Sequence, residues 1–119
     1  MIKKYKGYLI DLDGTVYTGK ERIDSARDFI FRLVKAEIPY LFVTNNSLRT
    51  PEQVNKILKE MDIPSTPEHV ITVGQAAASY VSEQNPKAKV FLIGEEGLRQ
   101  PFEKEGLQLV TENPDYLVI

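Results

Sequence analysis

The chain has 119 residues, of which 42% are hydrophobic and 27% are charged, values that are ordinary for one soluble globular domain. Its formal net charge of −2 gives no reason to expect a nucleic acid as a partner, and no apolar run approaches the length that crosses a membrane. The absence of cysteine excludes a disulfide, a thiolate metal site and a thiol nucleophile. A reducing cytoplasm suits such a chain, and we expect a cytoplasmic protein.

The first part of the chain predicts a strand, a helix and a second strand. Gly7–Leu12 is a nearly continuous apolar run, as in a strand that is buried on both faces. Apolar residues at helical spacing then predict an amphipathic helix over Ser25–Ala36, with Asp24 or Ser25 as its cap. Tyr40–Thr44 is the second predicted strand.

Two helix-start signals follow. Thr50 is placed to cap a helix that has Pro51 in its first turn and Gln53 completing a capping box. Thr66 and Pro67 repeat the cap-and-proline pattern before a short segment, and an alanine-rich helix is predicted over Gly74–Glu83. The order strand, helix, strand, helix, helix favours an α/β fold with a parallel sheet.

The segment Asn85–Lys87 is the most plausible domain boundary, because a new cycle of elements begins after it. A strand is predicted over Lys89–Ile93 and a helix over Glu95–Glu105. Pro101 lies inside that helix, so we expect a break there, with Gln100 capping a second piece. Short strands are then predicted over Leu107–Thr111 and Tyr116–Ile119.

Two carboxylates follow the first predicted strand. Asp11 and Asp13 are two residues apart, so they project to the same side while the chain is extended. Gly14 then lets the chain turn at a point where a bulky side chain would crowd a ligand. Open α/β sheets bind ligands at the carboxyl ends of their strands, and two close carboxylates favour a divalent cation such as Mg²⁺. With the metal present, one carboxylate can stay ionised as a nucleophile while the other exchanges a proton.

These motifs resemble those of a known superfamily. Asp11-Leu-Asp-Gly-Thr15 resembles the first motif of the haloacid dehalogenase superfamily, and Tyr40-Leu-Phe-Val-Thr-Asn-Asn-Ser47 resembles the second. Together with Gly94-Glu-Glu-Gly97 they are more similar to the NagD-like branch, which contains nucleotide, sugar-phosphate and pyridoxal-phosphate phosphatases. The resemblance implies a Rossmann-like parallel sheet core over residues 1–85. Residues 86–119 would begin the α/β cap domain that this branch inserts into the core.

The resemblance also implies a reaction and its residues. Asp11 would be the nucleophile that forms an aspartyl-phosphate, and Asp13 the general acid and base. Mg²⁺ would be held by the Asp11 carboxylate and the Asp13 backbone carbonyl. Thr44 and the backbone N–H groups of Asn45 and Asn46 would bind the substrate phosphate. The expected substrates are small phosphorylated metabolites such as nucleotides or sugar phosphates, with no nucleic acid or membrane partner and a possible homodimer through the cap.

The later motifs of the superfamily have no match in this sequence. The lysine of the third motif and the acidic residues of the fourth would lie beyond Ile119, so we expect an N-terminal part of a longer protein with impaired catalysis. If 119 residues are the whole natural protein, a non-catalytic phosphate-binding or interaction domain becomes the better interpretation. A bacterial receiver domain has a similar size, but it needs an aspartate where this chain has Thr44, Asn45 and Asn46.

Several of these residues also have simpler interpretations. The two aspartates could cap a turn, and Asn45 and Asn46 could be loop residues that tolerate left-handed backbone conformations. Tyr17–Gly19 could be a flap beside the site or an ordinary loop. The single histidine, His69, has no partner pattern around it and is expected at the surface, neither a metal ligand nor a base.

Overall fold

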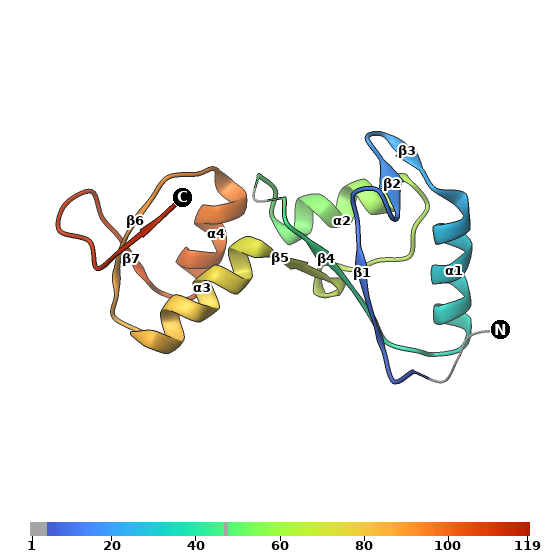
Figure 1. Ribbon diagram of the computed structural model, residues 1–119, viewed down its shortest axis with the longest axis horizontal. Coiled ribbons are helices and arrows are strands. Elements are labelled where there is room, and N and C mark those ends of the chain that lie inside the picture. Colours follow the sequence, from blue (N-terminus) through green and yellow to red (C-terminus); the bar gives the residue numbers. More distant parts are fainter. Residues whose placement is uncertain (1–4, 47) are drawn as a thin grey trace. The chain divides into compact units, whose positions relative to one another are not determined.

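Strands and helices follow one another along the chain in the computed structural model, which describes residues 5–46 and 48–119 (Figure 1). The chain divides into two compact units. The first unit contains the residues up to Thr44 together with Glu52–Ile71, and the second contains residues 45–51 and Thr72–Ile119. These limits lie elsewhere along the chain than Asn85–Lys87. The assignment of residues 1–85 and 86–119 to two domains of the protein remains a prediction.

The first unit is built on a three-stranded sheet with the order β1, β4, β5. The strands are β1 (Tyr8–Asp11), β4 (Tyr40–Thr44) and β5 (Val70–Thr72). β1 and β4 are parallel, with Tyr8 opposite Tyr40 and Asp11 opposite Val43. The two longer strands lie where they were predicted, but the expected burial of the first strand on both faces is wrong, since Leu9 and Asp11 of β1 are exposed. β5 was missed, since three residues between two helices are too short for a clear strand pattern.

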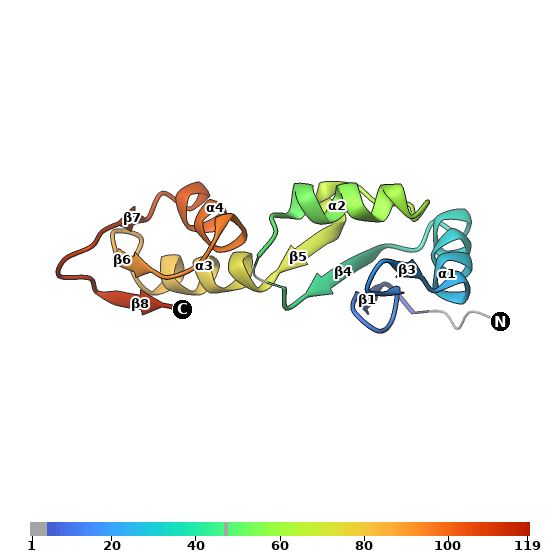
Figure 2. The same cartoon turned by 90° about the horizontal axis from the view of Figure 1, so that it is seen from above.

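Two helices pack against this sheet. The helix α1 (Asp24–Lys35) begins one residue earlier than predicted, and its N-cap is Ile23, so neither Asp24 nor Ser25 caps it. The helix α2 (Pro51–Glu60) begins at the predicted proline and lies on one side of β4 and β5 in Figure 2. Both helices contribute to one core with the sheet, which buries Leu12, Val16, Ile30, Leu33, Phe42, Val54, Leu58, Ile63 and Val70. One shared core means that α1 and α2 cover the same face of the sheet.

A hairpin and a short helix complete the first unit. The strands β2 (Tyr17–Thr18) and β3 (Glu21–Arg22) pair antiparallel around Gly19, whose φ is +60°. A glycine with positive φ at the first position of a two-residue turn matches the twist of a hairpin. The segment expected as a flap or a loop therefore begins a hairpin. The 3₁₀ helix η1 (Pro67–His69) follows the predicted cap-and-proline signal.

The single histidine, which was expected at the surface, is partly exposed and partly covered. The His69 ring stacks on the Tyr40 ring, with the centroids 4.4 Å apart and the planes 3° from parallel. Its Nδ1 accepts a hydrogen bond of 3.0 Å from the backbone N–H of Thr66. The Tyr40 hydroxyl donates to the carbonyl of Pro64 at 2.8 Å, and burial raises the pKa of Tyr40. The pKa of Glu68 is lowered by a hydrogen bond from its own backbone N–H and another from the Thr66 side chain.

The second unit repeats the α/β pattern on a smaller scale. Its sheet has the order β7, β6, β8, and both neighbours of β6 run parallel to it. The helices α3 and α4 supply the rest of its core, which buries Ala78, Val81, Ala88, Val90, Leu98, Phe102 and Leu107. The elements are α3 (Val73–Gln84), β6 (Lys89–Leu92), α4 (Glu96–Lys104), β7 (Gln108–Leu109) and β8 (Tyr116–Val118).

The predicted break at Pro101 is wrong, because α4 continues through this residue. Pro101 and Phe102 are both buried, so tertiary packing offsets the loss of the hydrogen bond that the proline cannot make. The acceptor of that bond would be the carbonyl of Gly97, which lies instead against Gly74 of α3. A Cβ atom at Gly74 would be 2.5 Å from this oxygen. The two helices can therefore approach closely only because position 74 is glycine.

Within the described part of the chain, none of the helices is long and apolar enough to cross a bilayer.

Candidate active site

The two predicted acidic residues flank a buried leucine at the end of β1. Leu12 is fully buried, whereas Asp11 and Asp13 are exposed. The carbonyl of Leu12 accepts hydrogen bonds from the backbone N–H groups of Thr15 (3.0 Å) and Val16 (2.9 Å), and Val16 is itself fully buried. The turn is therefore fixed to the core on both sides. The pattern exposed, buried, exposed presents both carboxylates on the side away from the core.

Gly14 has the backbone conformation that a turn after Asp13 requires. Its φ is +82°, in the left-handed region that favours glycine, and its N–H donates to the carbonyl of Tyr17 at 2.8 Å. No atom would lie within 4 Å of a Cβ at this position. The positive φ confirms the expectation that Gly14 lets the chain turn after Asp13. The expectation that a side chain here would crowd a ligand remains a prediction.

Thr44 is the last residue of β4 and is only 3% exposed. Because Asp11 lies opposite Val43 in a parallel register, Thr44 is one step further along at the same end of the sheet. The carboxyl ends of two neighbouring parallel strands thus carry Asp11 and Thr44, and Asp13 follows two residues later. The shared placement was predicted from the sequence, and the chemical role of each residue stays a prediction.

Asn45 and Asn46 continue the chain directly after β4, but they belong to the second unit. Asn45 is exposed and Asn46 is half-buried. The Oδ1 atom of Asn46 accepts a hydrogen bond of 2.8 Å from the backbone N–H of Leu48, which is the pattern of an Asx turn. This contact supports the simpler interpretation of Asn46 as a turn residue. Ser47, the last residue of the quoted motif, lies outside the described residues.

A hollow of about 450 Å³ lies between β1 and α1, beside Asp11. Its polar lining comes from Asp11, Thr15 and Ser25. The remaining lining is apolar and consists of Tyr8, Leu9, Ile10, Ala26, Phe29 and Ile30. Sequence periodicity gave Ser25 only a capping role and gave no sign of a hollow, because periodicity cannot show which sheet edge stays open.

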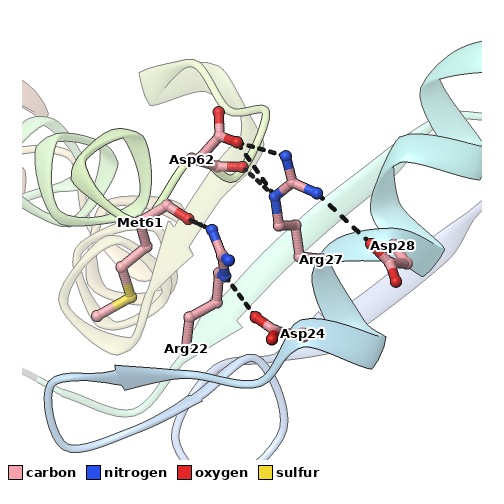
Figure 3. A network of polar contacts seen from close by, with 6 residues as sticks. All are labelled: Arg22, Asp24, Arg27, Asp28, Met61 and Asp62. Atoms are coloured by element: carbon pink, nitrogen blue, oxygen red, sulfur yellow. Dashed lines mark hydrogen bonds and ion pairs between the residues drawn. The ribbon is translucent and has the colours of Figure 1, made fainter.

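Arg22 of the hairpin and Arg27 of α1 form hydrogen bonds and an ion pair with the turn after α2 (Figure 3). Arg22 donates to the side chain of Asp24 and to the carbonyl of Met61, each at 2.8 Å. Arg27 forms an ion pair with Asp62, and the hydrogen bond in that pair raises the pKa of the guanidinium. The turn that carries the two carboxylates leads into this hairpin, so the network fixes the chain on the far side of the site.

The donor atoms at the turn agree in kind with a magnesium ion. Mg²⁺ prefers oxygen ligands, and one or two carboxylates commonly hold it while several water molecules remain bound. Asp11 and Asp13 are both exposed and follow one strand, so they meet that description. Over residues 5–46 and 48–119 there is no group of three or more His, Cys, Asp or Glu side chains that could hold a metal ion. The described residues therefore offer two carboxylates of the kind that hold Mg²⁺ and no larger group of metal-binding side chains.

Two curated proteins are similar to this chain over nearly its whole length. The chain is 51% identical over 118 residues to the 5′-nucleotidase YutF of Bacillus subtilis and 50% identical over 119 residues to an acid sugar phosphatase of Staphylococcus aureus. Each comparison covers 99% of this chain and 46% of the relative, so the chain spans about half the length of these curated relatives.

Solved structures of other proteins have the same fold as this chain. A p-nitrophenyl phosphatase from Archaeoglobus fulgidus is 30% identical, with a TM-score of 0.87 over 96% of this chain and 44% of that one. NagD from Escherichia coli K-12 is 21% identical, with a TM-score of 0.89 over 98% of this chain and 46% of that one, and shows the fold alone.

A family model supports the same assignment and rules out the receiver-domain alternative. The model for haloacid dehalogenase-like hydrolases matches residues 8–108, a range that contains β1, the turn with both carboxylates and β4. The chain belongs to the haloacid dehalogenase-like hydrolase family.

Proposed function

We propose that this chain is the N-terminal part of a Mg²⁺-dependent phosphomonoester hydrolase. The observation that carries the proposal is the turn in which buried Leu12 separates exposed Asp11 and Asp13, at the sheet end where Thr44 also lies. Relatives named as a 5′-nucleotidase and an acid sugar phosphatase support small phosphorylated substrates such as nucleotides or sugar phosphates.

Asp11 is the nucleophile in this proposal. Its carboxylate attacks the phosphorus of the monoester in line, the bond to the leaving oxygen breaks, and an aspartyl-phosphate forms. Asp13 gives its proton to the leaving alkoxide and then takes a proton from the attacking water. That water breaks the aspartyl-phosphate, which releases inorganic phosphate and regenerates the Asp11 carboxylate.

The phosphate group is held by the end of β4. Thr44 donates its hydroxyl hydrogen to a phosphoryl oxygen, and backbone N–H groups at Asn45 and Asn46 add further donors. The Asp11 carboxylate and the Asp13 backbone carbonyl would hold Mg²⁺, which would offset the repulsion between an anionic nucleophile and an anionic substrate.

The rest of the proposed protein lies outside this chain. Residues 1–85 form the N-terminal part of the core, and residues 86–119 begin a cap domain that also mediates a homodimer. The protein is cytoplasmic, which agrees with the absence of cysteine. Because the chain spans 46% of its relatives, we expect the isolated chain to have severely impaired catalysis.

A non-catalytic phosphate-binding domain is the second candidate. It is favoured by the described carboxylates, which supply part of a metal site, and it applies if the natural gene product has a mass of 13.5 kDa. Such a protein would bind inorganic phosphate but would not hydrolyse phosphate esters.

Hydrolysis of p-nitrophenyl phosphate, nucleoside monophosphates and sugar phosphates by the natural gene product tests the proposal. We expect activity with Mg²⁺, its loss with EDTA, and a decrease of about 10³-fold or more for Asp11→Asn, because this change removes the nucleophile. Glu112→Gln is the control, since this exposed carboxylate is none of the residues proposed to act in the site. A gene product that hydrolyses none of these esters, or an Asp11→Asn variant with full activity, would contradict the proposal.

A further inference from the structure

The two carboxylates of the candidate site are held by different parts of the fold. Asp11 is the last residue of β1 and lies opposite Val43 in the parallel register with β4, so the sheet fixes its backbone. Asp13 lies outside the three strands of that sheet, and its backbone is paired with Tyr17 instead. A disturbance of the segment around Tyr17 should therefore reach Asp13 and leave Asp11 in place.

Two backbone hydrogen bonds with Tyr17 bracket Asp13. The N–H of Tyr17 donates to the carbonyl of Leu12, the residue before Asp13, at 3.4 Å. The N–H of Gly14, the residue after Asp13, donates to the carbonyl of Tyr17 at 2.8 Å. The place of Asp13 thus depends on β2, the strand to which Tyr17 belongs.

Arg22 fixes the strand that pairs with β2. It lies opposite Tyr17 in the hairpin, in which β2 and β3 have only two residues each. An isolated two-stranded hairpin is at best marginally stable in water, so so short a pair needs further support. The Arg22 side chain supplies it through two hydrogen bonds of 2.8 Å, from Nη1 to the carbonyl of Met61 and from Nε to the carboxylate of Asp24 (Figure 3).

The carbonyl of Met61 is a well-placed acceptor for this side chain. Met61 directly follows α2, and its N–H donates to the carbonyl of Ile57 inside that helix. Carbonyl groups at the end of a helix lack partners within the helix and carry the negative end of its dipole, so a guanidinium binds well there. Its planar fork can direct two N–H groups at two acceptors, whereas a lysine ammonium is a compact charge on a flexible stem. Arg22 therefore connects the hairpin to a helix that is packed in the core of the first unit.

We propose that Arg22 is a positioning residue for Asp13, through the hairpin and Tyr17, with no comparable effect on Asp11. The inference rests on the proposed function, in which Asp13 gives its proton to the leaving oxygen. That step matters most for alkyl monoesters such as sugar phosphates and nucleotides, because an alkoxide leaves poorly without a proton. It matters less for p-nitrophenyl phosphate, because p-nitrophenolate is a stable anion. Arg22 therefore supports the hydrolysis of alkyl esters selectively.

Kinetics of the natural gene product test this proposal. Arg22→Met is measured on p-nitrophenyl phosphate and on the sugar phosphate or nucleoside monophosphate that the unchanged protein hydrolyses fastest. The quantity compared is kcat/KM, because it covers the steps up to release of the leaving group. The Tyr17 side chain stays packed in the core, so Asp13 should be displaced and not freed. We expect a loss about 10-fold larger for the alkyl ester than for the aryl ester, and equal losses would overturn the inference.

Arg27→Met is the matched control. Arg27 contacts the same turn after α2 through Asp62, but it belongs to α1 and not to the hairpin. It should lower both activities by the same factor, and a change of the ratio as large as that in Arg22→Met would overturn the inference. Arg22→Lys keeps the charge but not the fork, so its ratio should lie between those of the unchanged protein and Arg22→Met. If Arg22→Met does not fold, an unchanged ratio in Arg22→Lys overturns the inference.

Hydrogen exchange separates this inference from the proposed function. In Arg22→Met, followed by mass spectrometry, the peptide with residues 12–18 should exchange at least about 5-fold faster, while the peptide with β1 should be unchanged. Arg27→Met should alter neither peptide, and unchanged exchange of residues 12–18 in Arg22→Met would overturn the inference. A gene product that hydrolyses no phosphomonoester would contradict the proposed function, and the exchange result would still decide whether Arg22 holds the turn at Asp13.

Discussion

Substitution of Gly74 by alanine should destabilise the second unit. The new Cβ would be 2.5 Å from the carbonyl oxygen of Gly97 and 3.4 Å from Cγ of Pro101. Cβ contacts below 3.0 Å essentially never occur, so α3 and α4 must separate by about 0.5 Å. Overpacking of this kind costs about 1–3 kcal/mol. Alanine regains at most about 1 kcal/mol over glycine inside a helix, and less here, because Gly74 is the second residue of α3. We expect a net loss of about 1–2 kcal/mol.

The assay must separate the two units, because they need not unfold together. Hydrogen exchange by mass spectrometry, together with the thermal midpoint, meets this need. We expect faster exchange in peptides from α3, β6 and α4, unchanged exchange in β1 and β4, and a midpoint lower by about 4 °C or more. Ser79→Ala, at an exposed position of the same helix, is the control and should change little. Unchanged exchange in α3 and α4 of the Gly74→Ala variant would refute the close approach of the two helices.

Two further predictions concern the first unit. Gly14→Ala should lower its free energy of unfolding by about 1–2 kcal/mol, because φ is +82°, and Gly14→Asn should lose less; equal losses in urea unfolding would contradict the conformational explanation. Burial raises the pKa of Tyr40 above its ordinary value of 10.0, so its contribution to stability is complete below that pH and is lost as the pH rises through the folded-state pKa. Between pH 9 and 11, Tyr40→Phe should therefore lose less stability than the natural chain, and parallel losses would show that this hydroxyl does not titrate as described.

The elements predicted correctly are those with a long or strongly periodic pattern. β4 has the predicted limits, and α1 and α3 differ from the predicted helices by one residue at each end. The elements that were missed, β2, β3 and β5, have only two or three residues each, and so short a pattern is weak evidence for a strand. β7 and β8 are equally short, and they were predicted only as parts of the longer runs Leu107–Thr111 and Tyr116–Ile119. The break predicted at Pro101 failed for a different reason. Proline usually breaks a helix, but the packing of Pro101 against α3 outweighs this preference. The contact with α3 cannot be predicted from the sequence of α4 alone.

The candidate site was predictable where it depends on strand ends. Asp11 and Thr44 lie at the same end of the sheet because parallel neighbouring strands place their carboxyl ends together. The side chain of Asn46 was not predictable in the same way, since its hydrogen bond to Leu48 depends on local loop geometry. The open edge of β1 also could not be predicted, because strand order depends on contacts between distant parts of the chain.

The stacking of His69 on Tyr40 makes the only histidine a spectroscopic reporter of the first unit. A ring that lies parallel to another at a centroid distance of 4.4 Å feels its ring current, which shifts the carbon-bound imidazole protons upfield in a proton NMR spectrum. Because the chain has one histidine, these protons give two signals that need no further assignment. Tyr40 and Thr44 belong to the same strand, so the two signals follow the integrity of the strand that ends at the proposed phosphate site.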